Sequence, residues 1–246
     1  MYLLLRKRNL PTLGVIMPSN NLVINGLRVP IPKSVIDVGG TATNYLDDFV
    51  NNIGGKEPHL SNGKRVKPLV TFVLHETCGN SATGCKETLR KEGLGVHLIL
   101  DKNGIISNHA DLATEICWHA NQCNSVSVGM EVVNAYRPEI TRDPHGDIVP
   151  SEWWTWVPKG QPKTYVTPTK IQMDVARIFV PWLCGVLQIP ITFPTISLNA
   201  KKSQISGWKK FPKGWSAKPG PGIVAHRDFS SHGDGRYMLE DIIESV

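Results

Sequence analysis

Three apolar runs of β-forming residues constrain this chain most, because each carries an ionisable side chain at or near its end. They read PLVTFVLH, SVSVGMEVV and GIVAHRD. Runs without polar alternation are typical of strands buried on both faces of a sheet. Helical patterns lie between them, at residues 81–93 and 167–187. Strands that alternate with helices predict an α/β fold, with a mixed central β-sheet flanked by helices.

Local signals add detail to this pattern. Asn-Gly within VINGLRV predicts one β-hairpin, and Lys-Asn-Gly within LILDKNGIIS predicts a second. Thr167 is the expected N-cap of the helix at 167–187, with Pro168 in its first turn. Pro181 should kink or break this helix. The last residues, RYMLEDIIESV, predict a closing helix.

The chain is predicted to divide into two parts. Residues 1–65 form an N-terminal extension or cap, and residues 66–246 form the main domain. Within the second part, long loop insertions are expected near 137–165 and 191–221, where Pro, Gly, Trp and Lys gather. Long loops inside a compact domain are usually functional or mobile.

Charge and hydropathy narrow the class of partner. The net charge is +6, which favours acidic partners such as nucleic acid, anionic membrane surfaces or anionic polymers. No stretch is long and apolar enough to span a bilayer, so no integral membrane segment is expected. The start, MYLLLRKRN, places charges after a very short apolar run, the reverse of a secretory signal. Synthesis in the cytoplasm is therefore expected.

The five cysteines do not indicate a zinc finger or a disulfide framework, since their number is odd and no CxxC pair occurs. Cys78 and Cys85 are close enough in the chain for a bridge. Two free thiols are the alternative, which suits a cytoplasmic product better.

Two histidines and an aspartate are the strongest candidates for chemistry. His75 and His226 each end an apolar run, and Asp234 follows in SSHGDGR. Strand ends are where α/β folds place reactive side chains. Two imidazoles and a carboxylate suffice to hold catalytic zinc, with a fourth position left open. Taken singly, each histidine also has an ordinary explanation as an interior or surface residue.

Four separated blocks of the sequence resemble one family. VTFVLHET, GVHLILDKNGIIS, CWHANQCNSVSVGMEVV and GIVAHRDFSSHGDGR occur in the order typical of the zinc N-acetylmuramoyl-L-alanine amidases. That family includes phage endolysins, muropeptide amidases and peptidoglycan recognition proteins. The resemblance covers about residues 67–136 and 166–244. It implies Zn²⁺ as cofactor, bacterial peptidoglycan as partner, and hydrolysis of the amide between N-acetylmuramic acid and L-alanine.

The resemblance also assigns roles to single residues. His75, His226 and Asp234 fall on the zinc-ligand positions. Glu131 falls where catalytic members carry a glutamate, which would act as the general base. The alternative is a charged residue on a strand edge that faces solvent, but a carboxylate without a partner in such an apolar run would be costly, which favours the role of base. His232 stands where a lysine is common and could donate a hydrogen bond to an oxyanion, or be an exposed loop residue.

Further positions are expected either to contact the substrate or to have a structural role next to it. The substrate-binding set comprises His97, Trp118, His119 and Asn124. His97 is expected to orient the site rather than bind metal. Asn124 and Ser127 are expected to fix the loop that carries His119. Val96 stands where some members carry a tyrosine, so a tyrosine-assisted mechanism is not expected.

Two loop clusters have both a functional and a structural interpretation. Trp153, Trp154 and Trp156 could stack on sugar rings, or pack the insertion onto the core. The lysine-rich stretch at 201–218 could meet anionic wall polymers, or form a solvated face.

Three functions remain in competition. The leading hypothesis is a monomeric zinc amidase, acting on the cell wall as a phage-type lytic enzyme released at host-cell lysis, or as a bacterial recycling enzyme. The second is a peptidoglycan-binding module without catalysis, against which the retained ligands and Glu131 argue. The third, a nucleic-acid binder, rests on charge alone, since no recognised motif supports it. No nucleic-acid partner is therefore expected.

Overall fold

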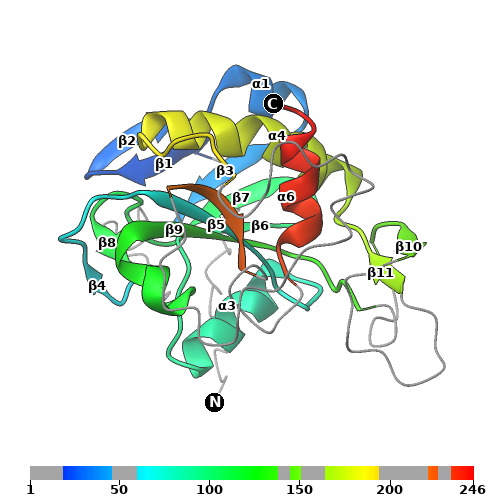
Figure 1. Cartoon of the computed structure of the whole chain (residues 1–246), viewed down its shortest axis with the longest axis horizontal. Coiled ribbons are helices and arrows are strands. Elements are labelled where there is room, and N and C mark those ends of the chain that lie inside the picture. The colour runs from blue at the N-terminus through cyan, green and yellow to red at the C-terminus, as the bar shows by residue number, and fades with distance from the viewer. Residues whose placement is uncertain (1–18, 46–59, 138–144, 151–163, 194–220, 227–233) are drawn as a thin grey trace, which may run out of the picture.

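The structure is a computed structural model that describes residues 19–45, 60–137, 145–150, 164–193, 221–226 and 234–246. Its centre is a six-stranded sheet with the strand order β12-β5-β9-β6-β7-β3 (Figure 1). The strands are β12 (Gly222–Ala225), β5 (Thr71–Glu76), β9 (Ser127–Val132), β6 (Leu98–Leu100), β7 (Ile105–Asn108) and β3 (Thr41–Asn44). Only β6 and β7 pair antiparallel among these neighbours, so the predicted mixed sheet is confirmed.

Helices cover both faces of this sheet (Figure 1). One face carries α1 (Lys33–Asp37), α4 (Lys170–Val186) and α6 (Arg236–Ile243). The opposite face carries α3 (Ala82–Lys91), whose N-cap is Ser81. The helices predicted at 81–93 and at the end of the chain are therefore confirmed. The fold is α/β, as the alternation of patterns predicts.

The two faces bury separate apolar clusters because side chains alternate along a strand. On the α4 face the main core includes Phe72, Leu74, Val128, Met130, Phe179, Leu183 and Leu239. On the α3 face Leu89 packs with Ile99 and Val133 in a smaller cluster. Burial of all six residues in β5 and in β9 agrees with the continuous apolar runs that predicted these strands.

The start of α4 differs from its prediction. Thr169, not Thr167, is the N-cap, and its hydroxyl accepts from the Gln172 amide at 3.2 Å. The Gln172 side chain accepts in return from the Thr169 amide at 2.9 Å, which completes a capping box. Thr167 instead accepts from the amide of Asp147. The helix also runs through Pro181 without a break, so of the two predicted outcomes the break is wrong and the kink stays a prediction.

Both predicted hairpins are confirmed. β1 (Asn21–Ile24) and β2 (Leu27–Pro30) pair antiparallel around Asn25 and Gly26, which have φ values of 52° and 74°. Two positive φ values identify the type I′ turn that Asn-Gly favours. β6 and β7 form the second hairpin.

The described part of the N-terminal extension is built into the core. β3 pairs in parallel with β7 and forms one edge of the central sheet. Leu22, Ile31 and Val35 lie in the main apolar cluster. The amide of Val23 donates to Asn108 Oδ1 at 2.7 Å, which joins the first hairpin to the end of β7. A domain boundary at residue 65 stays a prediction.

Short elements complete the described chain. Two small antiparallel ladders join β4 (Gly63–Lys64) with β8 (Glu115–Ile116), and β10 (Ile148–Pro150) with β11 (Thr164–Val166). A 3-10 helix, η1 (Asn121–Val126), leads directly into β9.

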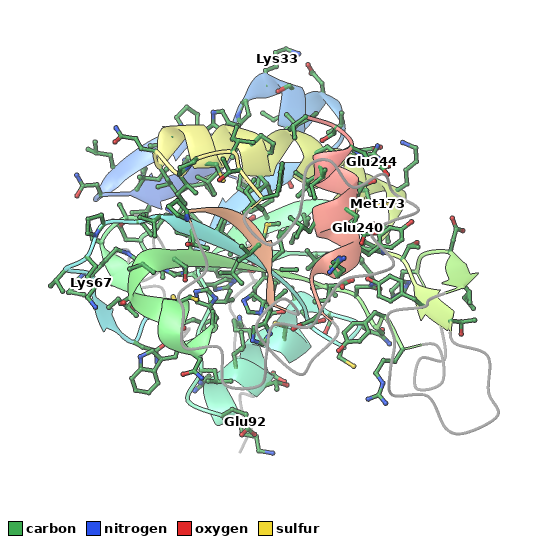
Figure 2. All side chains as sticks on the ribbon, viewed as in Figure 1. Lys33, Lys67, Glu92, Met173, Glu240 and Glu244 are labelled. Atoms are coloured by element: carbon green, nitrogen blue, oxygen red, sulfur yellow. The ribbon has the colours of Figure 1, made fainter. Side chains whose placement is uncertain are left out.

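Four of the charged residues labelled in Figure 2, Lys33, Lys67, Glu92 and Glu244, are exposed, whereas Glu240 on α6 is buried. The five cysteines are free thiols, Cys78 and Cys85 included. Within the described ranges, no helix is long and apolar enough to cross a membrane.

Candidate metal site

Strand alternation brings the predicted site residues to one face of the sheet. Leu74 on β5 and Met130 on β9 point into the core beneath α4. The residues that follow them, His75 and Glu131, therefore point to the opposite face. His75 and Glu131 are also Cα partners in the β5–β9 ladder, so their side chains emerge side by side.

His226 joins them from the neighbouring strand. Ala225, the last residue of β12, is the Cα partner of Leu74, which places His226 beside His75. The imidazole centroids of His75 and His226 are 4.5 Å apart. His75 is buried, and His226 is partly exposed.

Asp234 reaches the site from the loop before α6, directly ahead of the N-cap residue Gly235. Gly235, the N-cap of α6, has a φ of 80°, a conformation that favours glycine. A Cβ at Gly235 would lie 2.0 Å from the carbonyl oxygen of Leu74, so no other residue fits against this strand. The Gly235 amide donates to Glu76 Oε2 at 2.9 Å. These contacts hold Asp234 over the end of β5.

The three side chains offer ligand atoms that converge. His226 Nδ1 lies 3.1 Å from both carboxylate oxygens of Asp234, and His75 Nδ1 lies 3.9 Å from Asp234 Oδ2. One ligand atom from each residue lies within 4.8 Å of the others. Ligands about 2.0–2.2 Å from a tetrahedral zinc ion are roughly 3.3 Å apart. The donor set and its spacing fit zinc.

Burial and the neighbouring side chains together set the protonation of His75 and Asp234. The pKa of His75 is lowered to about 4, by burial and then by the neighbouring His226, so its imidazole is neutral and has a free lone pair. Burial opposes ionisation of Asp234, but the imidazole of His226 and then that of His75 hold its pKa below the usual range. Neutral imidazoles and an ionised carboxylate are the forms that bind a divalent cation.

Glu131 provides a second carboxylate beside the ligands. Its Oε1 lies 3.9 Å from His75 Nδ1, and its Oε2 is buried without a hydrogen-bond partner among the described residues. Burial raises the pKa of Glu131 well above its usual value, and the charges of Asp234 and Glu76 add to the shift. A carboxylate oxygen that has no hydrogen-bond partner among the described residues and lies next to the candidate cation site is suited to accept a proton from water.

Comparison with known proteins identifies the family. Residues 65–233, well over half of the chain, match the family model described as N-acetylmuramoyl-L-alanine amidase. The chain belongs to this amidase family. The match includes His75, Glu131 and His226, while Asp234 follows directly after its last residue.

Solved structures with the amidase-family fold show distant similarity. LysC, an N-acetylmuramoyl-L-alanine amidase from Clostridium intestinale, is 14% identical with a TM-score of 0.45, over 83% of this chain and 95% of LysC. Drosophila peptidoglycan recognition protein SA is 13% identical with a TM-score of 0.43, over 83% of this chain and 91% of that protein. Staphylococcus aureus AmiA is 10% identical with a TM-score of 0.40, over 72% of this chain and 70% of AmiA. No curated protein matches this sequence.

The other residues predicted for this amidase-family site lie in two layers. Trp118 is 52% exposed, and His119 beside it is partly buried with its Nδ1 3.0 Å from His75 Nε2. Asn124 Oδ1 accepts from the amides of His119 and Ala120, which fixes this loop. His97 is completely buried behind them, where its Nδ1 accepts from the Gly129 amide at 3.2 Å.

Some predicted residues lie outside the described ranges. His232 is one of them, and so are the three tryptophans at 153, 154 and 156 and the lysine-rich stretch at 201–218. Their roles stay predictions.

Two charged residues around the site escaped the sequence analysis. Glu76 is buried at the end of β5, where Asn134 Nδ2, Tyr165 Oη and the Gly235 amide donate to it. Burial raises the pKa of Glu76 to about 7, although these hydrogen bonds oppose the shift. Arg65 donates to the carbonyls of Glu115 and Ser127 at 2.7 and 2.8 Å. For Glu76, the signal in the sequence was a charged residue directly after His75 at the end of an apolar run.

Proposed function

We propose that this protein is a zinc-dependent amidase that hydrolyses the bond between N-acetylmuramic acid and L-alanine in bacterial peptidoglycan. One observation carries the proposal beyond family membership. Three convergent ligands, His75, His226 and Asp234, lie beside a buried carboxylate whose second oxygen has no partner among the described residues. A binding module has no need of that costly carboxylate.

The chemistry follows from this arrangement. Zinc, when held by His75, His226 and Asp234, supplies Lewis acidity that polarises the amide carbonyl and acidifies water. Glu131 Oε2 accepts a proton from the attacking water as the new C–O bond forms. Glu131 then passes this proton to the amine of L-alanine as the C–N bond breaks. The products are a lactyl carboxylate and a free stem peptide.

Trp118 is the proposed contact for the sugar. Trp118 is 52% exposed and directly precedes His119 in the chain. Its amide donates to Asn62 Oδ1 at 2.7 Å, which fixes the backbone at this position. An exposed indole next to a cation site offers a flat apolar surface on which a sugar ring can stack. His232 is proposed as a donor to the developing oxyanion.

The proposal is tested with Glu131→Gln. This variant keeps the shape of the side chain but cannot accept the proton, so the release of stem peptides from purified sacculi should fall by roughly 100- to 10,000-fold. Zinc content should stay at the wild-type level. Glu87→Gln is the matched control, because Glu87 is an exposed glutamate of α3 on the same face of the sheet. Its activity should be unchanged.

Two results would contradict the proposal. Activity of Glu131→Gln within tenfold of the wild type would remove Glu131 as the base. A wild-type protein that retains zinc and binds muropeptides, yet releases no product, would favour the binding module.

The proposed setting is a phage-type lytic enzyme that reaches the wall after release. The net charge of +6 supports a polymeric, anionic wall as the substrate. A recycling enzyme would prefer small soluble muropeptides. The rates on intact sacculi and on soluble muropeptides, compared at matched amide concentration, distinguish the two settings.

A further inference from the structure

A chain of hydrogen bonds runs from the proposed zinc ligand His75 into the protein. His75 Nε2 lies 3.0 Å from His119 Nδ1, and His119 Nε2 lies 3.1 Å from Ser127 Oγ. Ser127 Oγ in turn donates to the carbonyl of Cys123 at 2.8 Å. The chain therefore ends on a group that can only accept.

Because the Cys123 carbonyl can only accept, it fixes the donor and the acceptor of each hydrogen bond in the chain when both imidazoles are neutral. The Ser127 hydroxyl donates its only hydrogen to the carbonyl of Cys123, so it must accept a hydrogen bond from His119 Nε2. His119 then carries its hydrogen on Nε2 and accepts at Nδ1, so His75 must donate from Nε2. The lone pair of His75 is left on Nδ1, the atom 3.9 Å from both Asp234 and Glu131.

We propose that His119 and Ser127 are positioning residues, which lock His75 in the tautomer that offers Nδ1 to the cation. This inference rests on the zinc site of the proposed function. It assigns to His119 a task behind the metal site, in addition to the substrate contact that the resemblance implies.

Packing holds the His119 ring in place independently of these bonds. A Cβ at Gly129 would lie 2.4 Å from His119 Nδ1 and 2.7 Å from its Cγ, so the ring occupies the space that this glycine leaves open. The ring of His97 packs edge-on against the His119 ring, with a centroid distance of 5.7 Å. Asn124 fixes the backbone of His119 through its amide.

Hydrogen-bond partners behind a metal-bound histidine typically contribute 10- to 100-fold in metal affinity. His119→Ala should therefore weaken zinc binding by roughly 10- to 100-fold, and Ser127→Ala by several-fold. His119→Asn should recover much of the loss, because Asn Oδ1 can accept in the place of His119 Nδ1. A residue that only fills space would not be rescued in this way.

The measurement is zinc affinity of the full chain by competition with a chelator, together with the visible absorption of the Co²⁺-loaded protein. Circular dichroism and thermal melting of the metal-free variants show that each is folded. The cobalt bands should shift in His119→Ala and return towards the wild-type position in His119→Asn.

A double-mutant cycle of Gly129→Ala with His119→Ala, read out as zinc affinity, provides a test that does not depend on one variant alone. The added methyl group collides with the His119 ring, so Gly129→Ala alone should weaken zinc binding about tenfold. In the His119→Ala background the ring is absent, and the same change should have almost no further effect. Independent effects that simply add would overturn the proposal.

The control uses a second buried histidine–serine pair. His109 Nε2 lies 2.8 Å from Ser107 Oγ, and the His109 ring stacks on Tyr45. His109→Ala should leave zinc affinity unchanged. Unaltered affinity in His119→Ala, an equal loss in His109→Ala, or a wild type that binds no zinc would each refute the inference. A wild type that binds zinc but cleaves no amide would defeat the proposed function alone.

Discussion

The candidate site has two halves that are held in different ways. His75 and Glu131 lie on adjacent, fully buried strands and are partners in a six-residue parallel ladder. His226 follows a four-residue strand at the edge of the sheet, and Asp234 precedes α6. The first half is fixed by regular backbone pairing. The second depends on a few local contacts, so it is the half that single substitutions should loosen most readily.

The largest effect is expected from removing a ligand in either half. His75→Ala and Asp234→Ala should each weaken zinc binding by more than the 10- to 100-fold expected of a residue behind the ligands. A zinc concentration of 1,000 Kd stabilises the wild type by about 4 kcal/mol, and both variants should lose this gain. Thermal unfolding of each protein with and without zinc measures this zinc-dependent stabilisation. Zinc affinity within tenfold of the wild type in either variant would argue against the assigned ligand.

A smaller effect is expected where Asp234 is anchored. Gly235→Ala should lower the free energy of unfolding by about 3 kcal/mol, because it adds a strained φ and a collision with the Leu74 carbonyl. Gly26→Ala is the matched control, since Gly26 has a φ of 74° but nothing within 4 Å of its added Cβ. It should cost about 1 kcal/mol. Equal costs from urea titration would show that Gly235 does not press against β5.

The next test removes the acceptor that holds Gly235. Glu76→Ala removes the carboxylate to which Asn134, Tyr165 and Gly235 donate, and should cost about 2 kcal/mol. Zinc affinity should fall as well, since Asp234 is no longer held. Glu76→Gln keeps one carbonyl oxygen and should lose less in both measurements. An alanine variant with wild-type zinc affinity would show that Glu76 serves the core and not the site.

The smallest effect is expected at the far contact of α6. Arg177 on α4 donates to both carboxylate oxygens of Asp241, at 2.9 and 2.6 Å. The pair lies at the surface, so Arg177→Ala should cost less than about 1 kcal/mol and leave zinc affinity unchanged. A marked loss of zinc affinity in this variant would mean that the position of Asp234 depends on the whole helix rather than on Gly235.

The same division explains how much could be predicted from sequence. His75, Glu131 and His226 lie in apolar runs, and two-residue alternation then places them on one face of a sheet. The order of neighbouring strands is not encoded in that alternation, and neither is the contact of His119 with His75. Glu76 was missed because a single charged residue inside a strand does not reveal which distant donors will meet it.

The start of α4 shows a different kind of miss. The sequence TKIQ already contains a capping box, with Gln three residues after the capping threonine. Because proline suits the first turn of a helix, Pro168 led to an N-cap prediction that is two residues too early. The structure uses Thr167 to bind the Asp147 amide and leaves the capping to Thr169. Two threonines flank the proline, and only Thr169 has a glutamine three residues later, so the capping box in the sequence was the signal that separates them.

The pairing of β3 with β7 has a practical consequence for anyone who shortens this chain. A fragment trimmed to the family match would begin at residue 65 and lose β3. The amides and carbonyls along β7 that β3 now occupies would face solvent, and so would apolar side chains that Leu22 and Val35 now cover. Uncovered strand edges recruit other chains. Such a trimmed fragment should form aggregates at concentrations where the full chain stays dispersed.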